Sequence, residues 1–235
     1  IGGTGGSQAN TITDFGTSSA TATSSYALLS VTVNGILIRN SVGFNVSYNT
    51  ITSSNGSVVL QTMNGIQIQA SSNAPTTTFT NNINYNTISL QSGLATGAIN
   101  GITYPSGSAS ATSVVNINNN NFTRLNHSVT ASAAITAITI ASTNLTTSIS
   151  NNTFTNLSTN TTGSFTFISN NITVPAGGSQ TINGNQIVTA FSKTGIGGTL
   201  TGITSGGLSN TITQNWNNNN FSNITVTGAT TVSYT

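Results

Sequence analysis

Residues 148–163 read SISNNTFTNLSTNTTG. Only Ile149, Phe154 and Leu157 are apolar in this stretch, and every other residue is Asn, Thr, Ser or Gly, without a single charge. At its centre lies the pattern apolar-x-x-Asn-x-apolar, formed by Ile149, Asn152 and Phe154. This pattern decides the fold, because it recurs along the whole chain.

Further copies of the pattern are VSYNTI (46–51), INYNTI (83–88), INNNNF (117–122), INGNQI (182–187) and WNNNNF (216–221), with a weaker copy, ANTI, at 9–12. The recurring asparagines are Asn10, Asn49, Asn86, Asn120, Asn152, Asn185 and Asn219. They follow one another at steps of 39, 37, 34, 32, 33 and 34 residues. A period of this size is typical of a solenoid, in which each repeat buries its apolar face against its neighbours.

A second motif alternates apolar and polar residues with a period of two, which indicates a strand with one buried face. Its copies are NGILI (34–38), NGIQI (64–68), NGITY (100–104), TAITI (136–140), SFTF (164–167), TGIT (201–204) and TTVSY (230–234). Together the two motifs predict three short strands per repeat and a stacked core. We expect that core to contain Ile36, Ile66, Ile102, Ile138 and Ile203 from one strand, and Ile51, Ile88, Phe122, Phe154, Ile187 and Phe221 from another.

The sequence therefore predicts an all-β fold: one domain over 1–235, a single-stranded parallel β-helix (β-solenoid) of about seven coils, each of roughly 34 residues. A leucine-rich repeat also carries an Asn ladder, but its repeat is shorter and rich in Leu. A β-sandwich or propeller would show hairpin turns, which are missing here.

The recurring Asn is expected at a corner between two strands, where it tolerates a left-handed backbone. Its amide can bond to the equivalent amide of the next coil, which gives an Asn ladder. Charged residues in the same register would repel one another, because coils lie about 4.8 Å apart. Stacking like on like thus explains part of the depletion of charge.

Composition excludes several classes of function. The chain has three Lys or Arg, one acidic residue, one His and no Cys. Nucleic-acid binding needs clustered basic residues, and zinc sites need three or four ligands, so we expect no nucleic-acid partner, no metal and no cofactor. No apolar run is long enough to span a membrane. A charged fraction of 2% is far below the average of about 25%, which suggests a chain made for the outside of the cell.

The repeats ISNNTFTNL, NINNNNF and NGIQI resemble the right-handed parallel β-helix repeats of large bacterial surface and secreted proteins. The fold of that group is shared with pectate lyases, and long uncharged versions resemble proteins exported by type IX secretion. The resemblance covers nearly the whole chain, and it implies a right-handed coil, as does the bias of parallel crossovers. The calcium-binding Asp cluster and the basic catalytic residue of pectate-lyase-like enzymes do not carry over.

No catalytic set emerges. Asp14 is the only acidic residue, whereas glycoside hydrolysis usually needs two carboxylates, and Asp14 and His127 are expected about three coils apart. Arg124 and His127 are interpreted as a solvated turn, with contact to a sugar or carboxylate as the alternative. Lys193 is interpreted as a solvated loop charge. Trp216 is expected to pack inward; an exposed Trp stacking on sugar is the alternative.

These observations predict a non-enzymatic, extracellular structural module: a rigid rod of a secreted or cell-surface adhesin or filament. The expected partners are copies of itself or neighbouring repeats, end to end. Because neither end resembles a cap, and Ile1 follows no recognisable leader, we expect a processed chain or a segment of a longer array. Alternatives are a carbohydrate-binding module that contacts glycans, an enzyme whose catalytic residues lie outside this segment, and an ice-binding face of Thr ladders, which repeats of 32 to 39 residues would make less flat.

Overall fold

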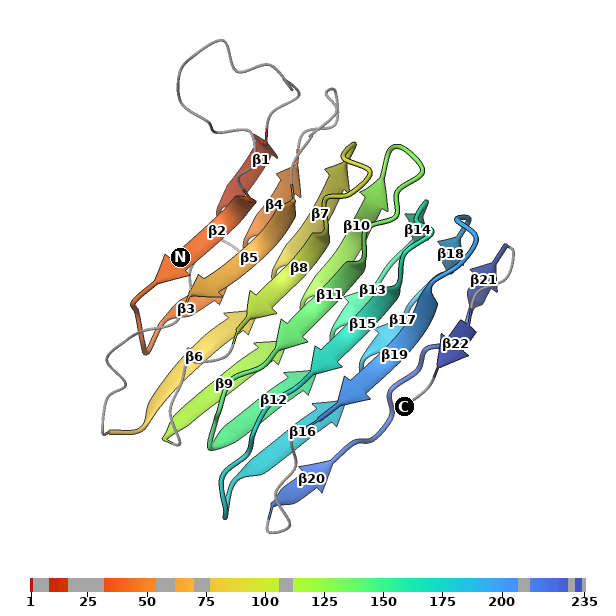
Figure 1. The fold of residues 1–235 in the computed structure, drawn as a ribbon. Coiled ribbons are helices and arrows are strands. Elements are labelled where there is room, and N and C mark those ends of the chain that lie inside the picture. Colours follow the sequence, from red (N-terminus) through yellow and green to blue (C-terminus); the bar gives the residue numbers. More distant parts are fainter. Residues whose placement is uncertain are drawn as a thin grey trace.

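The computed structural model describes residues 1, 9–16, 32–53, 62–69, 77–105, 112–206, 212–227 and 231–233. Within these residues the regular structure consists of strands, without a helix, and neighbouring strands pair in parallel. Each pair joins segments roughly one repeat apart in the sequence, so the chain winds as a coil whose turns stack on one another (Figure 1). The predicted parallel β-helix is confirmed.

Three long sheets form the faces of this β-helix. Sheet A contains β1 (Thr11–Phe15), β4 (Thr50–Ser53), β7 (Thr87–Ser92), β10 (Asn121–His127), β13 (Thr153–Phe154) and β17 (Gln186–Ile187). Sheet B contains β2 (Val33–Arg39), β5 (Met63–Gln69), β8 (Ile99–Tyr104), β11 (Ile135–Ile140), β15 (Phe165–Asn170), β19 (Thr199–Ser205) and β22 (Thr231–Ser233). Sheet C contains β3 (Asn45–Ser47), β6 (Phe79–Asn84), β9 (Ser113–Asn118), β12 (Thr146–Ser150), β16 (Ser179–Asn183) and β20 (Thr213–Asn215).

A short fourth sheet, sheet D, follows sheet A in the later coils. It contains β14 (Leu157–Thr159), β18 (Phe191–Lys193) and β21 (Ile224–Val226). In the earlier coils, β7 and β10 are longer, and their C-terminal ends occupy the position that sheet D takes in the later coils.

The number of complete coils is five, not about seven. The complete coils are β2-β3-β4, β5-β6-β7, β8-β9-β10, β11-β12-β13 and β15-β16-β17. In the described part of the chain, β1 belongs to an incomplete first coil, and after β19 and β20 sheet A contributes only a bridge at Asn220. The recurring asparagines therefore count corners rather than complete turns. The right-handed sense of the coil stays a prediction.

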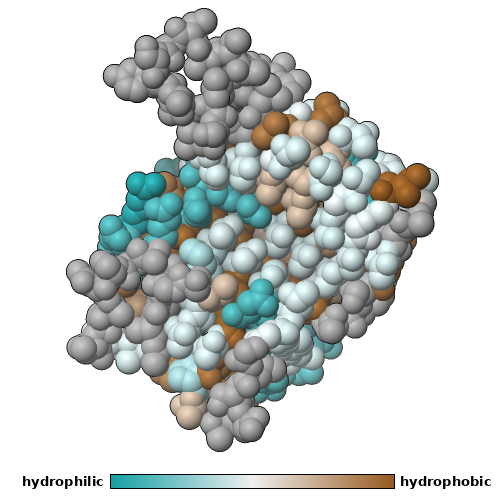
Figure 2. Space-filling model, in the orientation of Figure 1, coloured by the Kyte–Doolittle hydropathy of each residue, from teal (hydrophilic) through white to brown (hydrophobic). Residues whose placement is uncertain are grey.

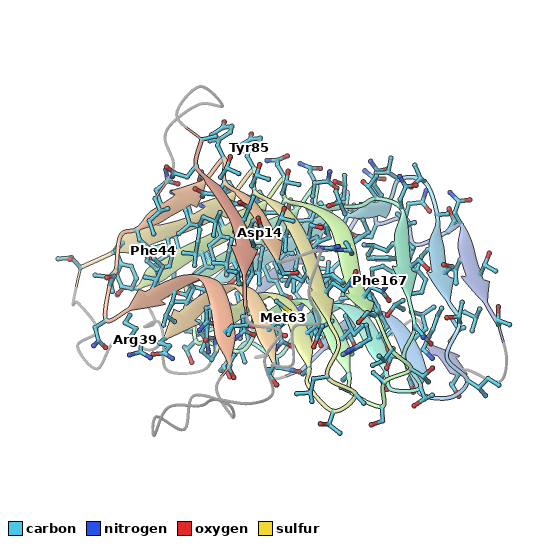
Figure 3. The ribbon with its side chains drawn as sticks, turned by 90° about the horizontal axis from the view of Figure 1, so that it is seen from above. Asp14, Arg39, Phe44, Met63, Tyr85 and Phe167 are labelled. Carbon is cyan, nitrogen blue, oxygen red and sulfur yellow. The ribbon has the colours of Figure 1, made fainter. Side chains whose placement is uncertain are left out.

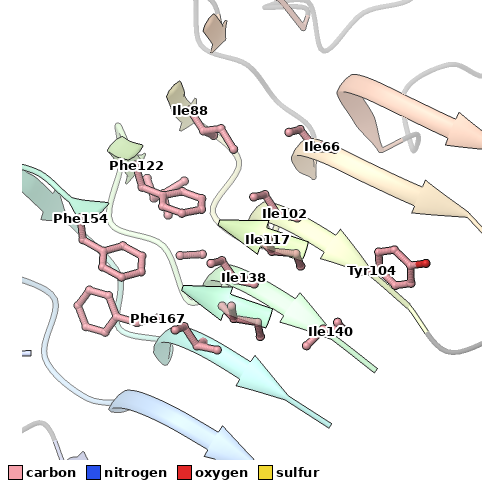
Figure 4. Packing of buried hydrophobic residues seen from close by; sticks show 14 of the residues in the cluster. Ile66, Ile88, Ile102, Tyr104, Ile117, Phe122, Ile138, Ile140, Phe154 and Phe167 are labelled. Atoms are coloured by element: carbon pink, nitrogen blue, oxygen red, sulfur yellow. The ribbon is translucent and has the colours of Figure 1, made fainter. Parts of the chain in front are cut away.

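The core is a set of parallel columns in which equivalent residues stack from coil to coil. In sheet A, Ile51 pairs with Ile88, Ile88 with Phe122, and Phe122 with Phe154. In sheet B, the column runs in order through Ile36, Ile66, Ile102, Ile138, Ile168 and Ile203. All of these residues are buried, and Phe221 is partly buried against them. Figure 4 shows part of both columns, with Ile88, Phe122 and Phe154 from sheet A and Ile66, Ile102 and Ile138 from sheet B. Ile168 is the member of the sheet B column that the sequence motifs did not identify.

Strands β11 and β15 of sheet B depart from the regular alternation of buried and outward-facing side chains, because two adjacent residues are buried in each. Phe167 and Ile168 are both buried although they are adjacent, and Ala137 and Ile138 repeat this arrangement in the preceding coil. The rings of Phe154 and Phe167 lie edge to face at 4.8 Å (Figure 4). The SFTF motif was interpreted as a strict alternation, and the irregular strand explains why Ile168 was missed.

The surface of the molecule is polar but almost uncharged. Most of the face seen in Figure 2 is coloured near white, the intermediate hydropathy of Ser and Thr. Among the described residues, Asp14 and Arg39 are exposed, whereas Arg124 is only partly exposed. Any surface site must therefore act mainly through hydroxyl, amide and aromatic groups.

Candidate functional site

The Asn ladder is continuous through all seven predicted asparagines. Each Nδ2 donates to the Oδ1 of the next asparagine, over 3.0 Å from Asn10 to Asn49 and 2.8 Å from Asn185 to Asn219. The four intervening bonds, Asn49 to Asn86, Asn86 to Asn120, Asn120 to Asn152 and Asn152 to Asn185, measure 2.8 to 3.0 Å. The ladder lies at the corner between sheets C and A, as predicted.

Each central rung uses both ends of its amide. In Asn152, Oδ1 accepts from both the backbone N–H and the Nδ2 of Asn120. Its Nδ2 donates to Asn185 and also to the carbonyl oxygen of Ile117 in the preceding coil. Asn152 is fully buried, so four bonds offset the cost of removing its polar atoms from water. The ladder therefore holds adjacent coils in register.

The left-handed backbone lies one residue earlier than predicted. Positive φ angles occur at Tyr48 (59°), Tyr85 (58°), Asn119 (58°), Asn151 (56°) and Asn218 (55°), each directly before a ladder asparagine. Gly184 occupies the same position in another coil, with φ at 65°. The residue before the ladder asparagine makes the turn, and this frees the asparagine to point inward and bond.

Tyr48 and Tyr85 form a stacked pair on this corner. Their rings are 4.8 Å apart and inclined by only 4°. Tyr85 is 49% exposed and lies at the outer margin of the molecule (Figure 3). A left-handed backbone costs a non-glycine residue about 1–2 kcal/mol, whereas an aromatic pair contributes about 0.5–1.5 kcal/mol. Stacking therefore offsets only part of the strain of two such residues.

Two ranks of hydroxyl side chains follow the corner on the outer face of sheet A. Backbone pairing aligns Thr11 with Thr50 and Thr50 with Thr87, and likewise Thr52 with Ser89. The first rank is Thr11, Thr50, Thr87, Asn121 and Thr153, in which Asn121 interrupts the hydroxyl groups. In the second rank Thr13, Thr52 and Ser89 are aligned, but the register shifts in β10, where Ser89 pairs with Arg124. The aligned hydroxyl groups thus extend over β1, β4 and β7 and are interrupted at β10, and the ice-binding hypothesis stays a prediction.

Arg124 and His127 lie on strand β10, and their interpretation as a solvated turn is wrong. Arg124 is partly exposed and donates to Gln91 Oε1 and to the carbonyl of Ser53, both at 3.3 Å. His127 is only 1% exposed. The two side chains point to opposite faces of the strand, so the structure does not bring them together as one ligand site.

Lys193 is buried as well, and its interpretation as a solvated loop charge is wrong. Its Nζ donates to the carbonyl oxygens of Gly195 and Gly197 at 2.6 and 2.7 Å, and the side chain is 0% exposed. Burial lowers the pKa of Lys193 below its ordinary value. The loop that follows β18 thus wraps around the ammonium group and replaces its water.

A buried polar column runs along one edge of the β-helix. Ser92 pairs with His127, and Thr159 pairs with Lys193; β14, which carries Thr159, lies against β10. All four side chains are buried. Burial lowers the pKa of His127, and backbone bonding to Ser92 and Leu94 acts in the opposite direction. No pattern in the sequence identified this column, because its members differ in type from coil to coil.

The charged residues do not form a catalytic set. Asp14 lies on β1 and His127 on β10, three strands apart in sheet A and thus separated by about 14 Å along the stack. In the described part of the chain, no three His, Cys, Asp or Glu side chains are grouped so that they could hold a metal ion. Trp216 packs against the core, as expected, and its Nε1 donates to Gln180 Oε1 at 3.1 Å.

Comparison with known proteins found no matching family model, no matching curated protein and no matching solved structure. Over the described residues, no helix has the length and apolar character needed to cross a membrane. Sequence reasoning missed the tyrosine pair, whereas it named a face of Thr ladders as one of the alternatives. Both had a signal in the sequence, since YNTI occurs twice and a Thr-x-Thr or Thr-x-Ser triplet occurs in four coils.

Proposed function

We propose that this chain is a rigid rod, a structural module of an extracellular adhesin or filament. The observation that carries the proposal is the unbroken Asn ladder through consecutive coils, with stacked columns beside it. The same side-chain bond joins each of these coils to the next. A solenoid built in this way gains length by adding repeats, without changing its cross-section.

The surface chemistry supports a location outside the cell. Uncharged hydroxyl and amide groups keep such a rod in solution independently of salt, because they have no charge to be screened. The resemblance of the repeats to bacterial surface proteins favours export by type IX secretion. The chain would then act as a non-enzymatic spacer that projects another part of the protein from the cell.

Neighbouring repeats are the proposed partners of the rod. The outermost strands described at one end are β1, β2 and β3, and each pairs with one neighbour in its sheet. On the outer edge of β3, the amino group of Ile1 donates to the Asn45 carbonyl and the Ile1 carbonyl accepts from the Ser47 N–H. A further parallel strand would add to the stack through backbone bonds of this kind, which favours end-to-end contact with more coils. Such a contact repeats without closing and can give a filament.

Insertion of extra coils tests the rod directly. A variant that carries three additional copies of residues 120–151 should be about 14 Å longer at unchanged cross-section. Small-angle X-ray scattering measures both quantities. A thicker or unfolded particle would refute the modular rod.

Two further measurements test location and activity. Antibody labelling of intact source cells should detect the chain at their surface, and labelling only after lysis would contradict the surface proposal. Incubation with plant and bacterial polysaccharides should release no new reducing ends. Measurable turnover would show that the non-enzymatic assignment is wrong.

A further inference from the structure

We propose that the face of the Tyr85 ring that is turned toward Asn119 is a binding site for neutral glycans. This inference goes beyond the structural rod and does not depend on it. At the corner before the Asn ladder, each coil places one outward side chain. Tyr48 and Tyr85 occupy this position in consecutive coils, and Asn119 occupies it in the next.

The tyrosine stack ends with a step. The two rings are parallel and 4.8 Å apart, so Tyr48 covers one face of Tyr85. On the other side the shorter Asn119 follows, and it cannot cover a whole aromatic ring. Tyr85 is accordingly 49% exposed at the outer margin of the molecule (Figure 3). The step therefore presents a flat apolar surface about as wide as one sugar ring.

The fold does not require tyrosine at this position. The equivalent residues Asn119, Asn151 and Asn218 adopt the left-handed backbone with less strain, as does Gly184. A bulky residue held in this conformation is an outlier that motivates a functional hypothesis. Tyrosine also suits binding, because it offers a large, rigid contact area with a polar tip.

The surroundings select a neutral ligand. Thr87 follows Tyr85 on the outer face of sheet A, next to Thr50 and Asn121 in the adjacent coils. These groups can exchange hydrogen bonds with sugar hydroxyls. Asp14 and Arg124, the charged residues on strands of sheet A, both lie four positions beyond the ladder asparagine of their coil, about 13 Å along the strand. Neither residue therefore places a charge beside the Tyr85 ring that would hold an acidic sugar.

Saturation-transfer NMR with short oligosaccharides tests the site. The probes are cellohexaose and mannohexaose, which are neutral, and hexagalacturonate, which is acidic. Wild-type protein should transfer saturation to at least one neutral probe and less to the acidic one. Because the surface is open and small, we expect dissociation constants on the order of 1 mM.

Three variants locate the contact. Y85N introduces the residue that other coils carry at this corner, so it should fold, and it should weaken binding by about tenfold or more. Y85F keeps the ring face and should bind like the wild type. Y48N is the matched control, since it makes the same exchange one coil away and leaves the proposed face in place. Circular dichroism confirms the fold of each variant.

Each remaining outcome would overturn the proposal. The proposal would fail if neither neutral probe received saturation from the wild type. It would also fail if Y85N bound as well as the wild type. Equal loss in Y48N would put the contact elsewhere on the stack. Preference for hexagalacturonate would exclude a neutral site. None of these results bears on whether the chain is a rod.

Discussion

The ladder asparagine is the most constrained residue of each coil, because both ends of its amide are bonded in a buried position. Replacing Asn152 with Ala would remove the acceptor for two donors of Asn120 and the donor for Ile117. Leaving a buried polar group unpaired costs about 1–3 kcal/mol. We therefore expect N152A to lower the free energy of unfolding by about 3–5 kcal/mol in urea denaturation.

The adjacent Asn151 provides the control for this experiment. It is exposed and left-handed, with φ at 56°, so N151G should change the stability by less than about 1 kcal/mol. Equal losses for N152A and N151G would mean that the ladder does not hold the coils together.

His127 gives the stability of the protein a simple dependence on pH. Burial holds its pKa in the folded state below the value of about 6.5 expected for the unfolded chain. Below pH 6.5, His127 is therefore protonated in the unfolded chain but stays neutral in the folded protein until the pH reaches its lower folded pKa. Stability should be constant just above pH 7, fall as the pH drops through 6.5, and level off below the folded pKa.

The composition makes this effect easy to isolate. Asp14 is the only acidic side chain, so few other groups titrate between pH 5 and 7. Chemical denaturation at several pH values measures the slope, and the variant H127L should abolish it. A slope that survives in H127L would assign the effect to another group.

Sequence reasoning located the ladder but misplaced the turn by one residue, and both results have a physical cause. Asn152 and its equivalents repeat in type because identical amides must bond to one another. The preceding position tolerates Tyr85, Asn151 or Gly184, so no single residue marks it. The burial of His127 and Lys193 was missed because it depends on which strand ends lie under a loop, and no local pattern encodes this.

At the scale of the element, strands of sheet B are shaped by what faces them. A Cβ at Gly101 would lie 2.4 Å from the carbonyl oxygen of Ala137 and 2.4 Å from Cε1 of Phe122. At Gly202 the nearest atom would be 3.3 Å away, on Phe221. We expect G101A to destabilise the protein by about 1–3 kcal/mol and G202A by less, as thermal unfolding would show. The reverse order would mean that β8 shifts to make room.

Phe154 joins sheet A to sheet B through its aromatic contacts. Its ring lies 5.3 Å from Phe122 and 4.8 Å from Phe167, and it is fully buried. F154A should cost about 3–5 kcal/mol, since the truncation would leave a cavity between two rigid sheets. A loss below 1 kcal/mol, measured by urea denaturation, would mean that neighbouring rings close the space.

Strand positions were predictable from the sequence where the alternation is regular, as in β9, in which Val115 and Ile117 are buried in turn. The prediction lost a core residue at Phe167 and Ile168, where two adjacent side chains point inward. Gly101 and Ile102 in β8 and Ala137 and Ile138 in β11 are buried in the same way, so the irregularity is shared by several strands of sheet B. Phe167 stands where other coils have Gly or Ala, and Ile187 rather than Phe follows in sheet A.

At the scale of the whole molecule, the repeat determines the architecture, whereas the features that differ from coil to coil lie on the outer surface. The number of complete coils was overestimated because the terminal asparagines belong to incomplete turns. The nearly uncharged surface could be predicted from the amino-acid composition alone. The stacked tyrosines, by contrast, matter only through their position on a corner, which no composition can indicate.

The direction of the bonds between coils has a mechanical consequence. Backbone bonds and Asn ladder both point along the rod, so tension on its ends would open one coil at a time. Each coil adds about 4.8 Å to the rod, but a freed repeat of 32 to 39 residues can extend to on the order of 110 Å. In the proposed surface rod, a sudden pull would therefore unfold the coils one after another, and each unfolding step would absorb mechanical work before the chain is fully extended.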